Sequence, residues 1–171
     1  MTSNVFLNSV LRKYCGSRFS GVYSSDNLPS LEQMRGKSLI CNLSKSNSPG
    51  THFIAAIIDR SGRRVLIIDS YGIPLFVRRI RDSFRPAEIY FSRARIQSSK
   101  STACGFFAML ICLAHANGDD IERLYSNFDQ HDLRKNDRIA SRLIAKYLRL
   151  LAKRRRVVFN QAEMRNITQL I

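Results

Sequence analysis

Residues 101–116 (STACGFFAMLICLAHA) are apolar on almost every side when they are drawn as a helix. A helix on the surface of a domain carries polar residues along its exposed face, so this segment predicts a helix buried at the centre. Gly118 follows it and predicts the end of the helix, because glycine readily takes the left-handed conformation found there. The rest of the chain must therefore supply the elements that cover this central helix.

Strand-like segments precede the central helix. Residues 37–44 have the composition of a strand, and residues 52–58 and 65–69 are continuous apolar runs, typical of strands buried on both faces. The linker 59–64 (DRSGRR) has the composition of a turn, so these two runs are expected to form a hairpin. Residues 88–96 alternate in part and predict a further strand.

Helices are expected at both ends of the chain. Residues 3–15 place apolar side chains on one helical face, with Ser3 as the N-cap and Gly16 at the end. A short helix over about 119–128 and a long helix over about 133–152 are expected after the central one. The order of helix, strands and then helices predicts an α+β fold with a small mixed or antiparallel sheet flanked by helices.

A single domain is expected to account for the whole chain. With 171 residues, the chain is long enough for one compact core and too short for two large ones. The domain would span residues 1–171, with a basic helical part over about 119–171. No apolar run reaches the roughly 20 residues of a membrane helix, and no signal peptide is evident, so neither membrane insertion nor secretion is expected.

Four polar or reactive side chains stand at the ends of the apolar elements. His52 opens one strand of the hairpin and Asp69 ends the other, so a chain reversal at 59–64 would place them side by side. Gln97 ends the last predicted strand, and Cys104 lies in the first turn of the buried helix. Each residue taken alone is most simply explained as structural. The four together, each at the matching end of its element, predict a site.

The chemistry of this set is nucleophilic. A thiol at a helix N-terminus, such as that of Cys104, is favoured as a thiolate by the helix dipole and by unpaired N–H groups. The imidazolium of His52 would lower its pKa further, and the carboxylate of Asp69 would orient the imidazole. Gly105 keeps the backbone accessible, so the Cys104 N–H can donate to an oxyanion, with Gln97 as the second donor. The set predicts acyl transfer.

The segments that carry these residues resemble the adenovirus-type cysteine proteases (adenains). That group belongs to the clan that includes the peptidases that process SUMO and other ubiquitin-like proteins. The separations of 17 residues from His52 to Asp69 and of 7 residues from Gln97 to Cys104 fit this family. The resemblance covers most of the first 116 residues, in four segments: 14–23 (YCGSRFSGVY), 49–53 (PGTHF), 66–72 (LIIDSYG) and 97–107 (QSSKSTACGFF).

The resemblance implies a cysteine endopeptidase with His52, Asp69 and Cys104 as its triad and Gln97 in its oxyanion hole. It further implies cleavage of viral capsid or core precursor proteins at Gly-containing sites, in the virion, the host nucleus or a viral assembly site. Members use DNA as a cofactor, and a short viral peptide activates the adenoviral enzymes through a disulfide. The region equivalent to the one that forms this disulfide lies around Pro86 and has no cysteine. A disulfide-linked activator is therefore not expected, and only activation by a peptide without that bond remains as an expectation.

The chain departs from the family pattern in other ways too. The acid is Asp69, as in the SUMO-processing branch, where many adenoviral members carry Glu. Phe53 stands where an aromatic residue, often Trp, follows the histidine. The chain is also shorter than the adenoviral type between Asp69 and Gln97, so substrate specificity is the least transferable property.

Basic residues are in large excess. The chain has 28 Lys and Arg against 13 Asp and Glu, a formal net charge of +15, which predicts attraction to polyanions. Ten of these basic residues lie within 134–156, and DNA is the expected partner; a solvated face with a localisation-like run is the alternative. The candidate contacts form a helical stripe and the run that follows it: Arg138, Arg142, Lys146, Arg149, Lys153, Arg154, Arg155 and Arg156.

The remaining cysteines do not suggest a metal site. Cys15, Cys41 and Cys112 show no CxxC spacing and are expected to be buried thiols, so no metal cofactor is expected. Three other functions remain open: an isopeptidase of the deubiquitinase or deSUMOylase kind, an acetyltransferase that uses the same triad, and a non-enzymatic basic DNA-packaging protein. A monomer is expected in each case.

Overall fold

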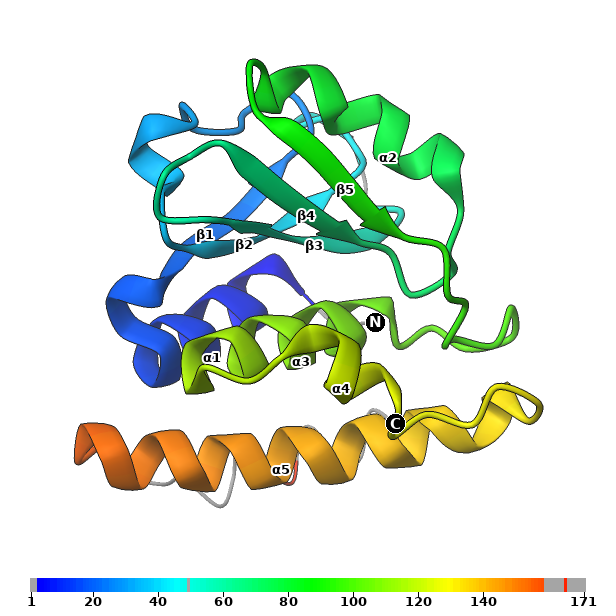
Figure 1. Ribbon diagram of the computed structural model, residues 1–171. Helices are drawn as coiled ribbons and strands as arrows, with labels where there is room; N and C mark the ends of the chain where they lie inside the picture. The colour runs from blue at the N-terminus through cyan, green and yellow to red at the C-terminus, as the bar shows by residue number, and fades with distance from the viewer. Residues whose placement is uncertain (1–2, 49, 159–164, 166–171) are drawn as a thin grey trace.

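The fold is seen in a computed structural model that describes residues 3–48, 50–158 and 165. Within them, five strands form one mixed sheet in the order β1-β2-β3-β4-β5 (Figure 1). The two outer pairs, β1–β2 and β4–β5, are parallel, and the inner pairs are antiparallel. The strands are β1 (Phe19–Ser24), β2 (Ser38–Asn42), β3 (Phe53–Ile58), β4 (Arg64–Ile68) and β5 (Glu88–Ser92). The predicted α+β class is confirmed.

Helices cover both faces of the sheet (Figure 1). Helices α1 (Asn4–Cys15) and α3 (Cys104–Asn117) lie on one face, and α2 (Pro74–Arg81) lies on the other. Helix α5 (Asn136–Arg155) packs against α3 on the side away from the sheet, and α4 (Ile121–Tyr125) stands between them in sequence. Helix α3 is therefore sandwiched between the sheet and α5.

The central strands are buried on both faces, as their continuous apolar runs predict. Along β3, Ala55 belongs to the cluster that includes α3, whereas Ile54 and Ala56 belong to the cluster under α2. Side chains alternate between the two faces of a strand, so each face needs its own apolar residues. Burying one such side chain as large as Ile54 contributes about 1.5–3 kcal/mol.

Helix α3 is the predicted buried helix, and every side chain from Phe106 to Ala114 is buried. It begins at Cys104, three residues later than expected, because the Ser101 hydroxyl accepts the Ala103 N–H and holds the preceding chain in a turn. Gly118 ends it in the left-handed conformation, as predicted, with a φ of 88°. The late start is what places Cys104 at the first helical position.

The predicted helix over 3–15 is confirmed as α1, and its predicted cap is present. The Ser3 hydroxyl accepts the Phe6 N–H at 3.1 Å, and Gly16 follows the helix with a positive φ of 56°. Removing a cap of this kind typically costs about 1 kcal/mol. The short and long helices expected near 119–128 and 133–152 are α4 and α5, the latter preceded by a 3-10 turn at Leu133–Lys135.

Three details differ from the prediction. β1 and α2 were not predicted, and the strand expected over 88–96 ends at Ser92. β5 ends there because the Ile96 and Gln97 N–H groups both donate to the Ser70 carbonyl, which takes the chain away from the sheet. Helix α2 is only eight residues long and buries only Val77 and Ile80, too weak a period to be recognised.

The prediction of one domain over 1–171 reaches beyond this description. Residues 1–2, Pro49, 159–164 and 166–171 lie outside the described residues, and they include the end of the basic part expected over 119–171. Among the helices of the described part, none combines the length and the apolar character needed to cross a bilayer.

Candidate active site

The hairpin brings His52 and Asp69 together. His52 directly precedes β3 and Asp69 directly follows β4, and the two strands pair antiparallel with Ala55 opposite Ile68. The His52 Nε2 atom lies 2.6 Å from the Asp69 Oδ1 atom, so the neighbourhood predicted from the chain reversal is confirmed. Asp69 is fully buried and His52 nearly so. A buried pair this close interacts far more strongly than it would in water.

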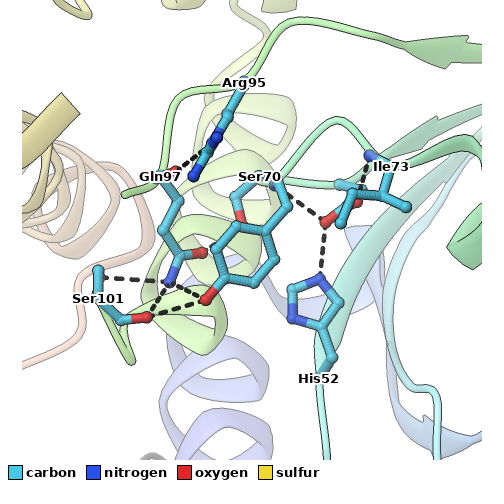
Figure 2. A network of polar contacts seen from close by, with 8 residues as sticks. His52, Ser70, Ile73, Arg95, Gln97 and Ser101 are labelled. Carbon is cyan, nitrogen blue, oxygen red and sulfur yellow. Dashed lines mark hydrogen bonds and ion pairs between the residues drawn. The ribbon is translucent and has the colours of Figure 1, made fainter. Parts of the chain in front are cut away.

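The backbone that follows β4 fixes the carboxylate of Asp69. Its Oδ1 atom also accepts the Tyr71 N–H at 3.1 Å, and its Oδ2 atom accepts the Ile73 N–H at 2.8 Å. Figure 2 shows the His52 ring directed at the carboxylate that receives the Ile73 N–H. With both oxygens engaged, the carboxylate can neither rotate nor leave, and Nδ1 is the ring nitrogen that remains for another partner.

Two aromatic rings pack against the imidazole. The Tyr71 ring stacks on His52 with centroids 4.9 Å apart, and the Phe76 ring lies at 5.0 Å in a tilted arrangement. These rings restrict the orientation of His52 and keep water from much of its surface. Neither contact was expected from the sequence: Phe76 is on the unpredicted helix α2, and Tyr71 is in the loop after β4.

Cys104 completes the set, as the first residue of α3 and the one partly exposed cysteine of the four. Its thiol lines the same cleft as the His52 ring. Burial alone would raise the pKa of the thiol, but hydrogen bonding by the His52 side chain and by the Phe53 and Gly105 N–H groups, together with the charge of His52, outweighs burial and lowers the pKa. The N–H groups of a first helical turn have no partner within the helix and so favour an anion there.

The ionisation of His52 responds in the opposite direction. Burial alone would lower the pKa of its imidazole, but the hydrogen bonds to Asp69 and Cys104 and their charges raise it to about 9. Both shifts favour a thiolate–imidazolium pair held by a carboxylate over the neutral thiol and imidazole. That combination can attack an electron-poor carbonyl carbon and return a proton to a leaving group.

The other three cysteines are buried thiols, as predicted. Burial raises the pKa of all three, that of Cys41 and that of Cys112 each to about 12, whereas the pKa of Cys104 is lowered. Cys104 thus differs from the other three cysteines in its surroundings and in the direction of its pKa shift.

Gln97 lies close by but faces the loop rather than the thiol. Its Nε2 atom donates to the Ser101 carbonyl at 3.0 Å and lies 3.3 Å from the Tyr71 hydroxyl, while its Oε1 atom accepts the Ser70 hydroxyl at 2.6 Å (Figure 2). Gln97 is fully buried and holds the loop that leads into Cys104. Its role as an oxyanion donor stays a prediction.

A cleft of about 760 Å³ opens over the thiol. It is lined by His52 and Cys104, by Tyr71 and Phe76, and by Asn42 at the end of β2. Asn42 is buried, and its Oδ1 atom accepts the Ser44 and Thr51 N–H groups, which shapes the loop before His52. Asn42, like His52, is a polar residue at one end of an apolar strand, so the same sequence signal could have identified it. It was not predicted from the sequence.

The predicted basic stripe lies on the exposed side of α5. Arg138, Arg142 and Lys146 are exposed at intervals of four residues, while Ile144 and Leu148 face α3. The rest of the basic set is also exposed: Arg149, Lys153, Arg154, Arg155 and Arg156.

Arg154 and Arg155 of that basic set donate hydrogen bonds to backbone carbonyls of other helices. The Arg154 guanidinium donates to the carbonyl of Asn117, and the Arg155 guanidinium donates to the carbonyl of Cys15. Both carbonyls are at helix ends, where their partners within the helix are missing. Arg154 and Arg155 thus help to hold α5 against α3 and α1.

The described residues contain no group of three His, Cys, Asp or Glu side chains that could hold a metal ion. The comparisons with known proteins add nothing to the site: no protein-family model matches the chain, and a search of curated proteins found no significant match.

Proposed function

We propose that this protein is a cysteine peptidase in which Cys104 is the nucleophile, His52 the proton carrier and Asp69 the group that orients His52. The observation that supports this most is the Cys104 thiol at a helix N-terminus, in the same cleft as an imidazole whose Nε2 atom lies 2.6 Å from a buried carboxylate. Several independent contacts favour the same charge-separated state, which a purely structural histidine does not need.

The proposed reaction is acyl transfer. The Cys104 sulfur forms a bond to the scissile carbonyl carbon, and the carbonyl oxygen becomes an oxyanion that the Cys104 N–H can stabilise. His52 gives its proton to the leaving amine as the peptide bond breaks and an acyl-enzyme remains. Water then attacks the thioester, His52 takes the proton of the water, and the thiolate leaves.

The resemblance to adenains supports a narrower version of the proposal. In it, the substrates are viral capsid or core precursors cut at Gly-containing sites during virion maturation. An isopeptidase or an acetyltransferase would use the same three side chains, and a DNA-packaging protein would use none of them. These alternatives differ in the substrate that Cys104 would attack, or in whether it attacks one at all, so a comparison of substrates separates them.

The decisive experiment is cleavage of fluorogenic peptides that end in Gly-Gly, by the wild type and by Cys104→Ala. Cleavage by the wild type and its loss in Cys104→Ala are expected, whereas Cys112→Ala, which removes a buried thiol of raised pKa, should remain active. A ubiquitin-like protein joined to a lysine side chain tests the isopeptidase, and an acyl donor tests the acetyltransferase. No turnover of any substrate, together with a Cys104 alkylation rate no higher than that of the other thiols, would favour the packaging protein.

We also propose that the outer face of α5 binds DNA. Exposed cations recur along it at helical intervals, and α5 has 20 residues, so at about 1.5 Å per residue the stripe is about 30 Å long. Contacts of this kind go to phosphates and carry no sequence preference.

The DNA proposal predicts a steep dependence on salt. If five cations of the stripe each neutralise one phosphate, log affinity falls against log salt with a slope of about −4.5. The double substitution Arg142→Ala with Lys146→Ala should make that slope shallower by about 1.8 in fluorescence anisotropy titrations with duplex DNA. The same loss of charge by Arg60→Ala with Arg63→Ala, in the turn between β3 and β4, should leave the slope unchanged. Equal effects of both pairs would contradict a site on α5.

A further inference from the structure

The cleft over Cys104 has an unbalanced charge. Of the ionisable side chains that line it besides the catalytic pair, two are cationic, Arg79 and Lys100, and no Asp or Glu lines it in the described part of the chain. Arg79 comes from α2 on one side, and Lys100 comes from the loop that leads into Cys104. Cations from two separate elements thus meet the same space as the nucleophile.

Neither cation is neutralised by the protein. Within the described residues, neither Arg79 nor Lys100 forms an ion pair, and both side chains are exposed. Other basic side chains near α2 are engaged: Arg81 and Arg85 both lie within ion-pair distance of Asp82. The carboxylate of Asp69 is fully buried and already interacts with His52 and two backbone N–H groups.

We propose that the cleft selects peptides with an acidic side chain, Asp or Glu, within a few residues of the bond to be cut, and that Arg79 and Lys100 recognise it. This inference rests on the proposed peptidase function and names the substrate class. A substrate carboxylate in the cleft would gain two cationic partners in a space already shielded by the Tyr71 and Phe76 rings. A substrate lysine would meet two like charges and no acid.

The size of the preference follows from ordinary ion pairs. A partly exposed pair is weak, and two of them together change kcat/KM by about fivefold to tenfold. The charge of the whole protein attracts every anion, but this attraction acts at long range and is screened over about 10 Å at 0.1 M salt. A local effect of Arg79 is therefore separable from the overall charge.

The first arm of the test uses peptides that differ only in one residue, Glu, Gln or Lys, placed in turn at each of the three positions on either side of the Gly-Gly site. For at least one position, the wild type should have the highest kcat/KM for the Glu peptide, a lower one for the Gln peptide and the lowest for the Lys peptide. The kcat/KM should differ by about fivefold to tenfold between Glu and Gln or between Gln and Lys. Arg79→Glu leaves one cation and one anion beside the cleft and should abolish the preference for Glu at that position. Arg78→Glu, a neighbour on α2 that makes the same change of net charge but does not line the cleft, should keep the wild-type order.

A second arm does not depend on peptide cleavage. Cys104 is alkylated with iodoacetate, which is an anion, and with iodoacetamide, which is neutral and otherwise similar, and the modified residue is quantified by mass spectrometry. In both reactions the thiolate displaces iodide and forms a carbon–sulfur bond. The iodoacetate-to-iodoacetamide rate ratio should fall severalfold in Arg79→Glu and stay unchanged in Arg78→Glu.

The outcomes are distinguishable. Equal cleavage of the Glu, Gln and Lys peptides at every position, or equal effects of the two substitutions on the alkylation ratio, would overturn the acidic-substrate inference and leave the peptidase intact. If the wild type shows no Cys104-dependent cleavage of any peptide, the proposed peptidase function is wrong. The alkylation ratio would still decide whether the cleft recognises anions.

Discussion

Replacing His52 by glutamine is expected to lower kcat for peptide cleavage by about 10⁴- to 10⁶-fold. Glutamine cannot take the thiol proton, return it to the leaving amine or carry the positive charge that stabilises the thiolate. Cleavage of the Gly-Gly peptide gives the rate, and alkylation of Cys104 by iodoacetamide at a series of pH values gives the ionisation of the thiol. Both readouts should change together, because His52 lowers the pKa of Cys104.

The direction of the pH effect follows from the shifts of the pair. In the wild type, alkylation should persist below the ordinary pKa of a thiol and be lost as the pH falls through the lowered pKa of Cys104. Cleavage should also decline as the pH rises through about 9, where His52 loses the proton that the leaving amine needs. In His52→Gln the alkylation profile should move to higher pH, towards that of an ordinary thiol.

The matched control is His131→Gln, which replaces an exposed histidine outside the cleft. It should leave both the cleavage rate and the alkylation profile unchanged. If His52→Gln removed cleavage but left the Cys104 profile as in the wild type, His52 would not be the partner of the thiol, and the proposed pair would be wrong.

Replacing Asp69 by asparagine is expected to lower kcat by about 10⁴-fold. The carboxylate accepts three hydrogen bonds, from the His52 ring, the Tyr71 N–H and the Ile73 N–H. Asparagine must turn its NH₂ group either towards the Ile73 N–H, which is also a donor, or towards His52. The second orientation forces the proton of a neutral imidazole onto the nitrogen that should accept the thiol proton.

The same substitution should also lower stability. A buried donor left without an acceptor costs about 1–3 kcal/mol, which urea unfolding measures as a lower midpoint. The control is Asp59→Asn at the opposite end of the hairpin, where Asp59 accepts the Arg63 and Arg64 N–H groups at the surface. Asp59→Asn should leave cleavage unchanged, and equal kcat values in the two variants would contradict the role of Asp69 in orienting His52.

Local patterns were sufficient to bring together His52 and Asp69, two of the proposed catalytic residues. A run of apolar residues that is interrupted by a turn forms an antiparallel hairpin, and a hairpin brings the start of one strand beside the end of the other. His52 and Asp69 therefore meet for a reason that involves only 18 consecutive residues. Cys104 joins them because the helix it begins is apolar on every side and must lie against that hairpin in the core.

Contacts between distant segments were not accessible in the same way. The side-chain contacts of Gln97 depend on a loop that folds back over it, and no period or spacing encodes the position of the Ser101 carbonyl. Phe76 and Arg79 reach the cleft from α2, whose docking on the sheet depends on Val77 and Ile80. An eight-residue helix of this kind is stabilised by the surface it covers more than by its own sequence.

Hydrophobic periodicity and turn chemistry over short distances were enough to predict the α+β class, the buried central helix, the hairpin and the His52–Asp69 pair. The enclosure and the charge of the site could not be predicted in this way. They depend on the rings of Tyr71 and Phe76 against His52, on the hydrogen bond from Gln97 to Ser101, and on the two cations that line the cleft with Cys104. These features arise where segments far apart in the chain pack together, and packing of that kind depends on the shape of the whole core rather than on any local pattern.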